Sequence, residues 1–475
     1  MRKTTVADVA RLVSAEIPCR LVGDGGSMVG PDVVRDNRDA TQGSLFVAFT
    51  GEHADGHDYA AKAAEAGASA ILASRETDAG VAHLICDDTV AGLSALARGL
   101  VDREIERGLV TFAITGSSGK TSTKDLLAQI LERSSSGDVV SPRGSYNNEI
   151  GVPLTACQID ENTQYFVAEM GADAKGDIEK LCRIVPPKIS MIINIGMAHL
   201  GKFGSREAIA DAKSEIFAAL QEDGWAVLNA DDDLIRKMRP KANIAAFSIT
   251  GELPKTEISV TVENVEGDEF DRYSFDLISS VRGQISRNRV SLKVLGKAQM
   301  IDSAAAATAA LAAGLTPDQI AEGLCHAEAR SSWRMALVEL PQNIAIINDA
   351  YNANPGSMSA ALHSLAKIGE CSARKRKTIA IVGDMLELGD GSAELHMQVG
   401  QLAVELGIDQ IYSVGQYAEK IAQGAARAGG QATVVQPDEV AEDLTLAAGD
   451  VVLVKASRGL ALEKVAERLT QRFSN

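Results

Sequence analysis

The stretch "VTFAITGSSGKTSTKDLL", residues 110–127, constrains the fold most, because it joins an apolar run to a glycine turn and then to a helical pattern. A buried strand that enters a helix through such a turn is typical of the phosphate-binding corner of a parallel α/β sheet. Gly116 and Gly119 let the backbone wrap around an anion, and the free N–H groups of the helix point at that anion. The stretch therefore predicts a parallel sheet with a phosphate site at its edge.

Lys120 and Thr121 supply the side chains that a nucleotide site needs at this turn. A lysine ammonium neutralises the outer phosphates, and a threonine hydroxyl can hold Mg²⁺. The spacing departs from the standard nucleotide loop, which has a glycine where this chain has Ile114. An ordinary strand-to-helix turn with an exposed lysine is the alternative. The strand before the turn and the helix after it favour the phosphate site.

Apolar runs organise the rest of the chain into three α/β domains. Long apolar runs followed by polar loops, such as "QYFVAEM", "ISMIINIG" and "WAVLNADD", indicate a parallel sheet covered on both faces. Residues 258–279 alternate apolar and polar side chains, which is typical of antiparallel strands with one wet face. A second doubly wound α/β pattern starts near residue 329. We expect domains at 1–108, 109–328 and 329–475.

Two polar side chains follow strands of the central domain, Glu169 after "YFVA" and His199 after "ISMIINIGMA". Polar groups at the carboxyl ends of parallel strands face the crevice where ligands bind. Beside a phosphate loop, a carboxylate and an imidazole suit a Mg²⁺-nucleotide site, although imidazole is an uncommon Mg²⁺ ligand. Alternatively, Glu169 caps a helix and His199 is a surface histidine.

Lys213 lies in the helical segment 206–220, four residues after Ile209 and four before Phe217. This spacing puts the lysine at the border of the apolar face instead of the solvent side. A lysine whose stem runs along apolar surface to reach water is the alternative.

The third domain also places polar residues after buried strands. Asp349 ends an apolar run, a polar loop at 352–355 follows, and Ser357 is expected to cap the next helix. The segment "KASRGL", residues 455–460, repeats the arrangement at the last strand. The density of hydrogen-bonding groups indicates a ligand, whereas a purely structural loop is the alternative.

Charge and hydropathy exclude several classes of protein. With 47 basic against 64 acidic residues the net charge is −17, so nucleic-acid binding is not expected. The first 15 residues predict a folded amphipathic helix and not a signal peptide. The most apolar segment elsewhere is too short to span a bilayer. The six cysteines are scattered, which favours reduced thiols and a cytoplasmic protein without membrane insertion.

Taken together, these motifs resemble those of the Mur ligases of peptidoglycan synthesis along nearly the whole chain. The short loop Gly-x-x-Gly-Lys-Thr of that family fits residues 116–121. Residues 36–72 look like its UDP-sugar-binding domain. The stretches "SYNNEIGVPLT", "DAYNANPGSM" and "VGDMLELGDGSAELH" are similar to the branch of the family that adds D-alanyl-D-alanine. The third-domain signature of the tripeptide-forming branch is not found.

The resemblance implies a fold and an activity. Residues 1–108 would be a small α/β domain for the UDP-muramyl-peptide, and residues 109–328 a P-loop ATPase-like parallel sheet with an antiparallel extension. Residues 329–475 would be a Rossmann-like domain for the incoming dipeptide. The enzyme would use ATP and Mg²⁺ to add D-alanyl-D-alanine to UDP-N-acetylmuramoyl-tripeptide through an acyl phosphate. The alternatives are another ligase of the family, such as the tripeptide-forming one, and a regulatory nucleotide-binding protein. A monomer is expected, since nothing demands an oligomer.

The resemblance also assigns roles to residues. The catalytic set would be Lys120, Lys213, His199 and Arg334, with Lys213 matching a lysine that some Mur ligases carbamylate. The metal would be held by Thr121, Glu169 and His199. The nucleotide would be bound by Gly116, Ser117, Ser118, Gly119, Lys120, Thr121, Ser122, Gln299, Arg334 and Asp349. The other substrates would be bound by Asn37, Arg38, Asn147, Asn148, Asn352, Asn354, Lys455, Ser457 and Arg458.

Two departures from the family pattern affect this assignment. The family has Gly-x-His-Asn-x-x-Asn where this chain has Ala298, Gln299 and Asp302 at the three polar positions. Gln299 can still form hydrogen bonds much as asparagine does, whereas an ionised Asp302 presents acceptors only, so the adenine contacts are expected to differ. The family's "DSR" is "DNR" at 36–38, a change that a hydrogen-bonding loop should tolerate.

Overall fold

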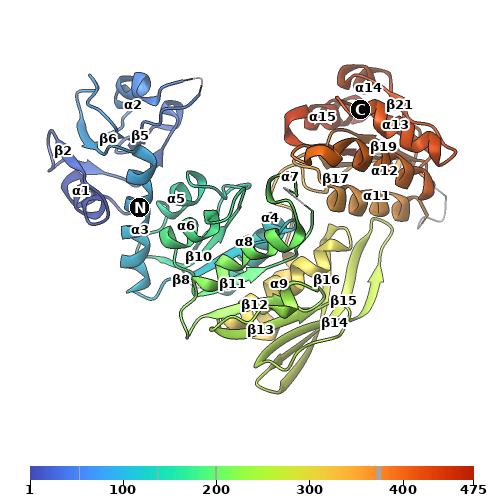
Figure 1. The fold of residues 1–475 in the computed structure, drawn as a ribbon, viewed down its shortest axis with the longest axis horizontal. Coiled ribbons are helices and arrows are strands. Elements are labelled where there is room, and N and C mark those ends of the chain that lie inside the picture. The colour runs from blue at the N-terminus through green and yellow to red at the C-terminus, as the bar shows by residue number, and fades with distance from the viewer. Residues whose placement is uncertain (53, 136, 198–199, 371–375, 475) are drawn as a thin grey trace.

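The computed structural model describes residues 1–52, 54–135, 137–197, 200–370 and 376–474. The chain forms three α/β units, each built on a large sheet of its own (Figure 1). The N-terminal unit, in blue, and the C-terminal unit, in orange and red, lie at opposite ends of the central unit in this view. The predicted mixed α/β fold with three domains is therefore confirmed, whereas the boundaries after residues 108 and 328 remain predictions.

The N-terminal unit holds a five-stranded sheet in the order β2-β7-β6-β5-β4. Its strands are β2 (Arg20–Val22), β4 (Val33–Val34), β5 (Leu45–Val47), β6 (Ala70–Ala73) and β7 (Ala82–Ile85). A separate pair joins β1 (Thr4–Thr5) to β3 (Met28–Val29). Helix α1 (Val6–Ser14) is capped by Thr5, whose hydroxyl accepts a hydrogen bond from Asp8 N at 3.1 Å. The amphipathic helix predicted for the start of the chain is confirmed, because its apolar side is buried.

Helix α3 (Thr89–Ile105) fixes the N-terminal unit to the central one. It packs against α1 on one side and against α5 (Gly151–Ala156) and α6 (Asp177–Ile184) on the other. One apolar cluster runs from α1 through α3 into the central unit, so no wet interface separates the two. Asp88 caps α3 by accepting hydrogen bonds from the backbone N–H groups of Val90 and Ala91.

The central sheet has nine strands in the order β16-β15-β14-β13-β12-β11-β8-β10-β9. The pairs from β9 to β14 are parallel, and β14, β15 and β16 pair antiparallel. The predicted parallel sheet with an antiparallel extension is therefore confirmed. Its strands are β8 (Val110–Thr115), β9 (Asp138–Val140), β10 (Thr163–Glu169), β11 (Ile189–Ile192), β12 (Trp225–Asn229), β13 (Asn243–Ser248), β14 (Ile258–Gly267), β15 (Arg272–Val281) and β16 (Gln284–Leu295).

Helices cover both faces of the central sheet, as its continuous apolar strands require. Helices α4 (Lys120–Ser134), α9 (Ala298–Ala312) and α10 (Pro317–His326) share one apolar cluster with the sheet. Helix α8 (Arg206–Ala218) packs with α3, α5 and α6 in the other cluster. Because β8, β10 and β11 are parallel neighbours, the residues that follow them meet at one edge.

The C-terminal unit is a doubly wound sheet in the order β17-β18-β22-β19-β20-β21, with only β17 antiparallel among its described pairs. Its strands are β17 (Ala336–Glu339), β18 (Ala345–Asp349), β19 (Thr378–Val382), β20 (Gln410–Ser413), β21 (Thr433–Val434) and β22 (Val451–Lys455). Its helices are α11 (Pro355–Glu370), α12 (Ser392–Glu405), α13 (Ala418–Arg427), α14 (Pro437–Asp443) and α15 (Glu463–Phe473). Separate apolar clusters fill the two faces, which confirms the second doubly wound unit.

Two of the contacts between the C-terminal unit and the central unit lie far apart along the chain, at Asp271 and at Gly201. Asp271, just before β15, accepts a hydrogen bond from Ser364 Oγ at 2.7 Å and lies 2.9 Å from Lys367 Nζ, both on α11. On the other side, a β-carbon added to Gly201 in α7 (Leu200–Phe203) would lie 2.9 Å from the backbone nitrogen of Gly389. The approach of the two backbones leaves no room for a side chain there.

Within the described part of the chain, no helix has both the length and the apolar character needed to cross a bilayer. The five cysteines of that part, Cys19, Cys86, Cys157, Cys182 and Cys325, form no disulfide.

Candidate active site

The glycine loop between β8 and α4 has a fixed shape. Gly119 has φ of 80°, and a β-carbon there would collide with the Asp302 carboxylate, so only glycine fits. Asn194, just after β11, accepts hydrogen bonds from the backbone N–H groups of Ser117 and Ser118 at 3.1 and 3.0 Å. The loop is therefore held by the neighbouring strand before any ligand arrives.

Lys120 and Thr121 open helix α4, as predicted. Lys120 Nζ donates to the carbonyl oxygen of Gly116 at 2.8 Å, across the loop, and burial lowers the pKa of its ammonium. Thr121 Oγ1 donates to Glu169 Oε2 at 2.8 Å and lies 2.7 Å from Ser145 Oγ. The side chain of Lys120 thus crosses the glycine loop, whose backbone would surround a phosphate.

Glu169 ends β10 and is buried at the bottom of the site. Its second oxygen, Oε1, accepts a hydrogen bond from Asn147 Nδ2 at 2.8 Å. No group of three or more His, Cys, Asp or Glu side chains in the described residues is arranged to hold a metal ion. The hydroxyl of Thr121 and the carboxylate of Glu169 are nevertheless hard oxygen donors of the kind that suits Mg²⁺. His199, the third predicted ligand, lies outside the described residues.

Lys213 on α8 is 4% exposed and lines the same cavity as the glycine loop. It is not a lysine on the outer surface. Burial lowers the pKa of its ammonium to about 7, and the positive charge of Lys120 adds to this effect. The neutral amine therefore carries a substantial share of the population at neutral pH.

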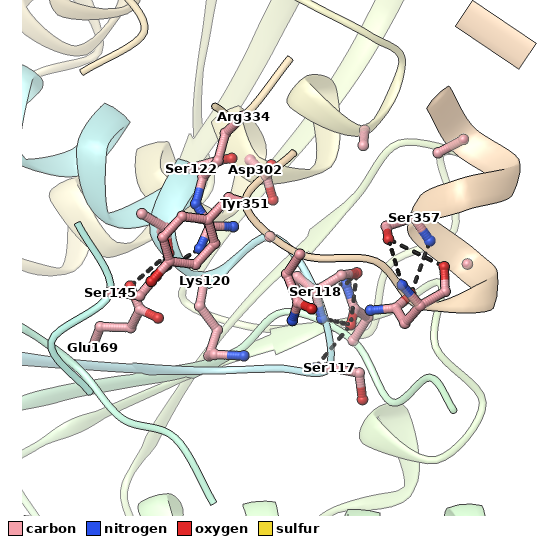
Figure 2. A pocket seen from close by; sticks show the side chains of 18 of the residues that line it. Ser117, Ser118, Lys120, Ser122, Ser145, Glu169, Asp302, Arg334, Tyr351 and Ser357 are labelled. Atoms are coloured by element: carbon pink, nitrogen blue, oxygen red, sulfur yellow. Dashed lines mark hydrogen bonds between the residues drawn. The ribbon is translucent and has the colours of Figure 1, made fainter. Parts of the chain in front are cut away.

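Arg334 comes from the segment that precedes the C-terminal sheet and reaches the central unit (Figure 2). Its Nη2 donates to Ser145 Oγ at 2.6 Å, and its guanidinium stacks on Tyr351, 4.1 Å from the ring centre. Its Nε is buried and finds no hydrogen-bond partner among the described residues. The arginine has a donor left for a ligand.

Asp349 ends β18 and supports this arginine. One oxygen accepts from the backbone N–H of Met335 at 3.1 Å, and the other from Lys455 Nζ at 2.7 Å. Trp333 and Met335, on either side of Arg334, have φ of 61° and 48°. The backbone around the arginine therefore sits in a conformation that non-glycine residues seldom adopt, held by Asp349 on one side.

These side chains line one cavity of about 1850 Å³ between the central and C-terminal units. The predicted site residues that line it are Ser117, Ser118, Gly119, Lys120, Thr121, Ser122, Asn147, Asn148, Glu169, Lys213, Gln299, Arg334, Asp349, Asn352, Asn354 and Lys455. Figure 2 shows Lys120, Glu169, Ser145 and Arg334 close together, with Ser357 at the other side of the pocket. Most of the predicted site is thus brought together by the ends of strands β8, β10, β18 and β22, by helices α8 and α9, and by the segment that carries Arg334.

A second cavity of about 1060 Å³ lies in the N-terminal unit and contains Asn37 and Arg38. Asp88 and Val90, at the start of α3, line both cavities. The two spaces therefore adjoin at the end of one helix.

Gly116, Ser457 and Arg458 do not line the main cavity. Ser457 Oγ accepts a hydrogen bond from the backbone N–H of Leu386 at 3.0 Å. Arg458 stacks on Trp333 and pairs with Glu463 at 2.5 Å. The surroundings of Ser457 and Arg458 are those of residues that hold loops in place, and their contact with a substrate remains a prediction.

The predicted cap of α11 was assigned to the wrong residue. Asn354 Oδ1 accepts from the backbone N–H of Ser357 at 2.9 Å, so Asn354 is the cap. Ser357 Oγ in return accepts from the backbone N–H of Asn354 at 3.1 Å. Two side chains in reciprocal contact satisfy the helix start, and the serine lies one turn further in than expected.

Sequence reasoning missed three contributors to this site, which are Ser145, Asn194 and Tyr351, and it named Asp302 only as a departure from the family's adenine pattern. Asn194 follows a buried parallel strand, so the strand-end rule that selected Glu169 applies to it as well. Ser145 and Tyr351 lie inside the stretches "SYNNEIG" and "DAYNANPG" that were singled out for their asparagines. Nothing in the local pattern indicated the contact between Asp302 and the glycine loop.

A phosphate loop at the carboxyl edge of a parallel sheet, facing a second doubly wound unit across one cavity, defines a multidomain α/β protein of the nucleotide-binding class. Profiles of one family match the three units in turn: the Mur ligase family catalytic domain at 33–101, the Mur ligase middle domain at 114–310 and the Mur ligase glutamate ligase domain at 333–458. The chain belongs to the Mur ligase family.

Relatives and solved structures match almost the full length. The UDP-N-acetylmuramoyl-tripeptide--D-alanyl-D-alanine ligase of Mycobacterium tuberculosis is 35% identical, over 99% of this chain and 98% of the relative. A crystal structure of MurF from Acinetobacter baumannii has a TM-score of 0.83 at 29% identity and covers 99% of both chains. MurF from Thermotoga maritima in complex with ADP has a TM-score of 0.76 at 28% identity, over 93% of this chain and 97% of its own.

Proposed function

We propose that this protein is an ATP-dependent ligase that adds D-alanyl-D-alanine to UDP-N-acetylmuramoyl-tripeptide and so forms the muramoyl-pentapeptide precursor of peptidoglycan. The names of the full-length relatives support the substrates, and the ADP complex of the Thermotoga relative supports the nucleotide. The observation that carries the proposal is the single cavity in which Lys120, Glu169 and Lys213 of one unit face Arg334 and Asp349 of another.

The phosphates of ATP are assigned to the glycine loop, because its N–H groups and Lys120 form a positive cradle at the start of α4. Thr121 and Glu169 would hold Mg²⁺, and the bound ion would neutralise the charge of the phosphates. His199 stays a predicted ligand. Gln299 is assigned to the base, because its Oε1 is buried without a partner among the described residues and can accept from an adenine amino group.

The reaction that fits this arrangement is carboxylate activation. The tripeptide carboxylate attacks the γ-phosphorus, which gives an acyl phosphate and ADP, and the D-alanyl-D-alanine amine then attacks the acyl carbon and expels phosphate. Two anions must approach each other in the first step. Lys120 from one unit and Arg334 from the other supply positive charge at that point, where it stabilises the transition state most.

The remaining site residues are assigned to the two substrates that become joined, the UDP-muramoyl-tripeptide and the dipeptide. Asn37 and Arg38 lie in the second cavity, apart from the residues assigned to ATP. Their hydrogen-bond donors suit the UDP end of the substrate. Asn147 and Asn148 line the main cavity on the side of the central unit and suit the peptide, and Asn352 and Asn354 line it on the side of the C-terminal unit and suit the dipeptide. We further propose that the enzyme works as a monomer and that it works in the cytoplasm, and the free cysteines of the described chain favour the second point.

A phosphate-release assay with UDP-N-acetylmuramoyl-tripeptide and a panel of amines tests the function. Phosphate release is expected to require ATP, the tripeptide and D-alanyl-D-alanine together, and to be poor with single amino acids. Comparable rates with meso-diaminopimelate on the dipeptide-stem substrate would instead identify a tripeptide-forming ligase. ATP turnover without any amine acceptor would favour a regulatory nucleotide-binding protein.

A further inference from the structure

Asp302 is a carboxyl group in an unusual place, directly behind the phosphate loop. It lies in the second turn of α9, is 2% exposed, and lines the main cavity beside Gln299. Its Oδ1 is so close to Gly119 that no β-carbon fits between them. Figure 2 shows it in the same pocket as Lys120, Ser122 and Arg334. An anion bound in the glycine loop would therefore lie on one side of Gly119, with the buried Asp302 carboxyl group on the other side.

Little positive charge is available to keep this carboxyl group ionised. Thr123 Oγ1 on α4 donates to Asp302 Oδ1 at 3.0 Å and is neutral. Lys120 directs its ammonium to the Gly116 carbonyl, and Lys124 directs its ammonium to the carbonyls of Pro142 and Gly144. Arg334 is the cation whose charge acts on Asp302 from the C-terminal side, and it is already bonded to Ser145. Lys297, the residue just before α9, is exposed.

We propose that Asp302 is a nucleotide-positioning residue whose carboxyl group is protonated and neutral when a nucleotide is bound. The binding of ADP or ATP then takes up one proton. The inference rests on the proposed assignment of the phosphates to the glycine loop. Phosphate oxygens carry a full negative charge in this loop, and a second negative charge behind Gly119 in a buried site is unfavourable. Protonation removes that charge.

In the free protein, the Asp302 carboxyl group is already close to being protonated at neutral pH. Burial raises the pKa of the Asp302 carboxyl to about 7, and the hydrogen bond from Thr123 and the charge of Arg334 oppose the rise only in part. Nucleotide phosphates would push the pKa further in the same direction. The neutral acid also has one O–H donor besides its acceptor, which restores the donor-and-acceptor character that an asparagine has at this position in the family pattern.

The test is a calorimetric titration of the full-length protein with ADP, at about pH 8, in two buffers that differ in ionisation enthalpy. At that pH most of the free Asp302 is ionised, so the wild type should take up about 0.5 to 1 proton more per ADP than the Asp302→Asn variant. The difference between the two proteins is the readout, because Lys213 and the nucleotide phosphates titrate in both. Asp318→Asn, on an exposed position of α10, is the matched control and should behave as the wild type.

Affinity gives a second, independent readout. Between about pH 7 and 9 the ADP affinity of the wild type should fall relative to that of Asp302→Asn, by up to about tenfold per pH unit. Thr123→Val removes the donor that lowers the pKa of Asp302, so the fall should begin at higher pH. Equal proton uptake and parallel pH profiles in the wild type and Asp302→Asn would overturn the role of Asp302 alone. Absence of ADP binding to every variant would overturn the proposed function together with it.

Discussion

Arg334 of the C-terminal segment donates from Nη2 to Ser145 Oγ of the central unit at 2.6 Å, and Ser145 in turn lies 2.7 Å from the Thr121 hydroxyl. The chain of contacts links the C-terminal unit to the first turn of the phosphate-loop helix. An arginine in this position serves the closed state of the site and not an apolar core.

Arg334→Ala is therefore expected to lower kcat/KM by about 100-fold or more, because it removes positive charge from the transferred phosphoryl group. The free energy of unfolding should fall by only about 1 kcal/mol, through the lost stacking on Tyr351. Steady-state phosphate release and urea unfolding measure the two effects. Arg330→Ala, whose exposed side chain pairs with Glu132, is the control and should leave turnover unchanged. Parallel losses of stability and activity would indicate a structural arginine.

An acyl-phosphate intermediate predicts where the oxygen atoms of the tripeptide carboxylate go. If the tripeptide carboxylate attacks the γ-phosphorus, one of its oxygens leaves with the phosphate when the amide forms. Substrate labelled with ¹⁸O in that carboxylate should therefore give labelled inorganic phosphate, which mass spectrometry detects. Unlabelled phosphate, with all label retained in the pentapeptide, would contradict the mechanism.

Lys213 is expected to react with CO₂ and to act as a carbamate. An ammonium cannot help to hold Mg²⁺, whereas a carbamate is a carboxylate on a long stem. Only the neutral amine adds CO₂, and since burial lowers the pKa of Lys213 to about 7, the neutral form prevails above pH 7 and the charged form below it. Activity at limiting bicarbonate should accordingly rise with pH across this value.

Lys213→Ala should be nearly inactive and partly rescued by acetate or formate, which can occupy the vacated carboxylate position. The measurement is turnover with and without the added anion, together with the mass of the intact protein under CO₂. Lys241→Ala, at an exposed position, is the control and should need no rescue. A near-normal rate for Lys213→Ala would rule out the carbamate.

The contact between Asp271 and α11 should determine how firmly the C-terminal unit is attached to the central unit. Asp271 is 2% exposed and is shared by Ser364 and Lys367, so Asp271→Ala removes the acceptor of the serine and the ion-pair partner of the lysine, which keeps its hydrogen bond to Tyr273. We expect a loss of stability of about 1–3 kcal/mol and a larger radius of gyration in small-angle scattering. The control is Lys293→Ala, which removes an exposed ion pair with Glu328 inside the central unit. An unchanged radius of gyration for Asp271→Ala would show that other contacts hold the unit.

The sequence predicted the parts of the site that depend on local pattern. The glycine loop, Glu169 and Asp349 all follow apolar runs, and a parallel sheet must bring such strand ends to one edge. The contact of Asp302 with Gly119 could not be predicted, because the two residues are brought together by the packing of α9 on α4 and not by any spacing along the chain. Likewise, the sequence gives no sign that Arg458 stacks on Trp333, since both the turn at Trp333 and the last strand must be in place first.

Asp88 and Val90 line both cavities, so the main cavity and the cavity around Asn37 and Arg38 are neighbours across one helix start. A compound that joins a weak ligand for one cavity to a weak ligand for the other would bind its second half at a high effective concentration. With a linker that just spans the distance past Asp88, such a bivalent inhibitor can gain about 10²- to 10⁴-fold in affinity without any new contact. The same geometry means that bulky substitutions at Val90 should penalise bivalent compounds far more than either half alone.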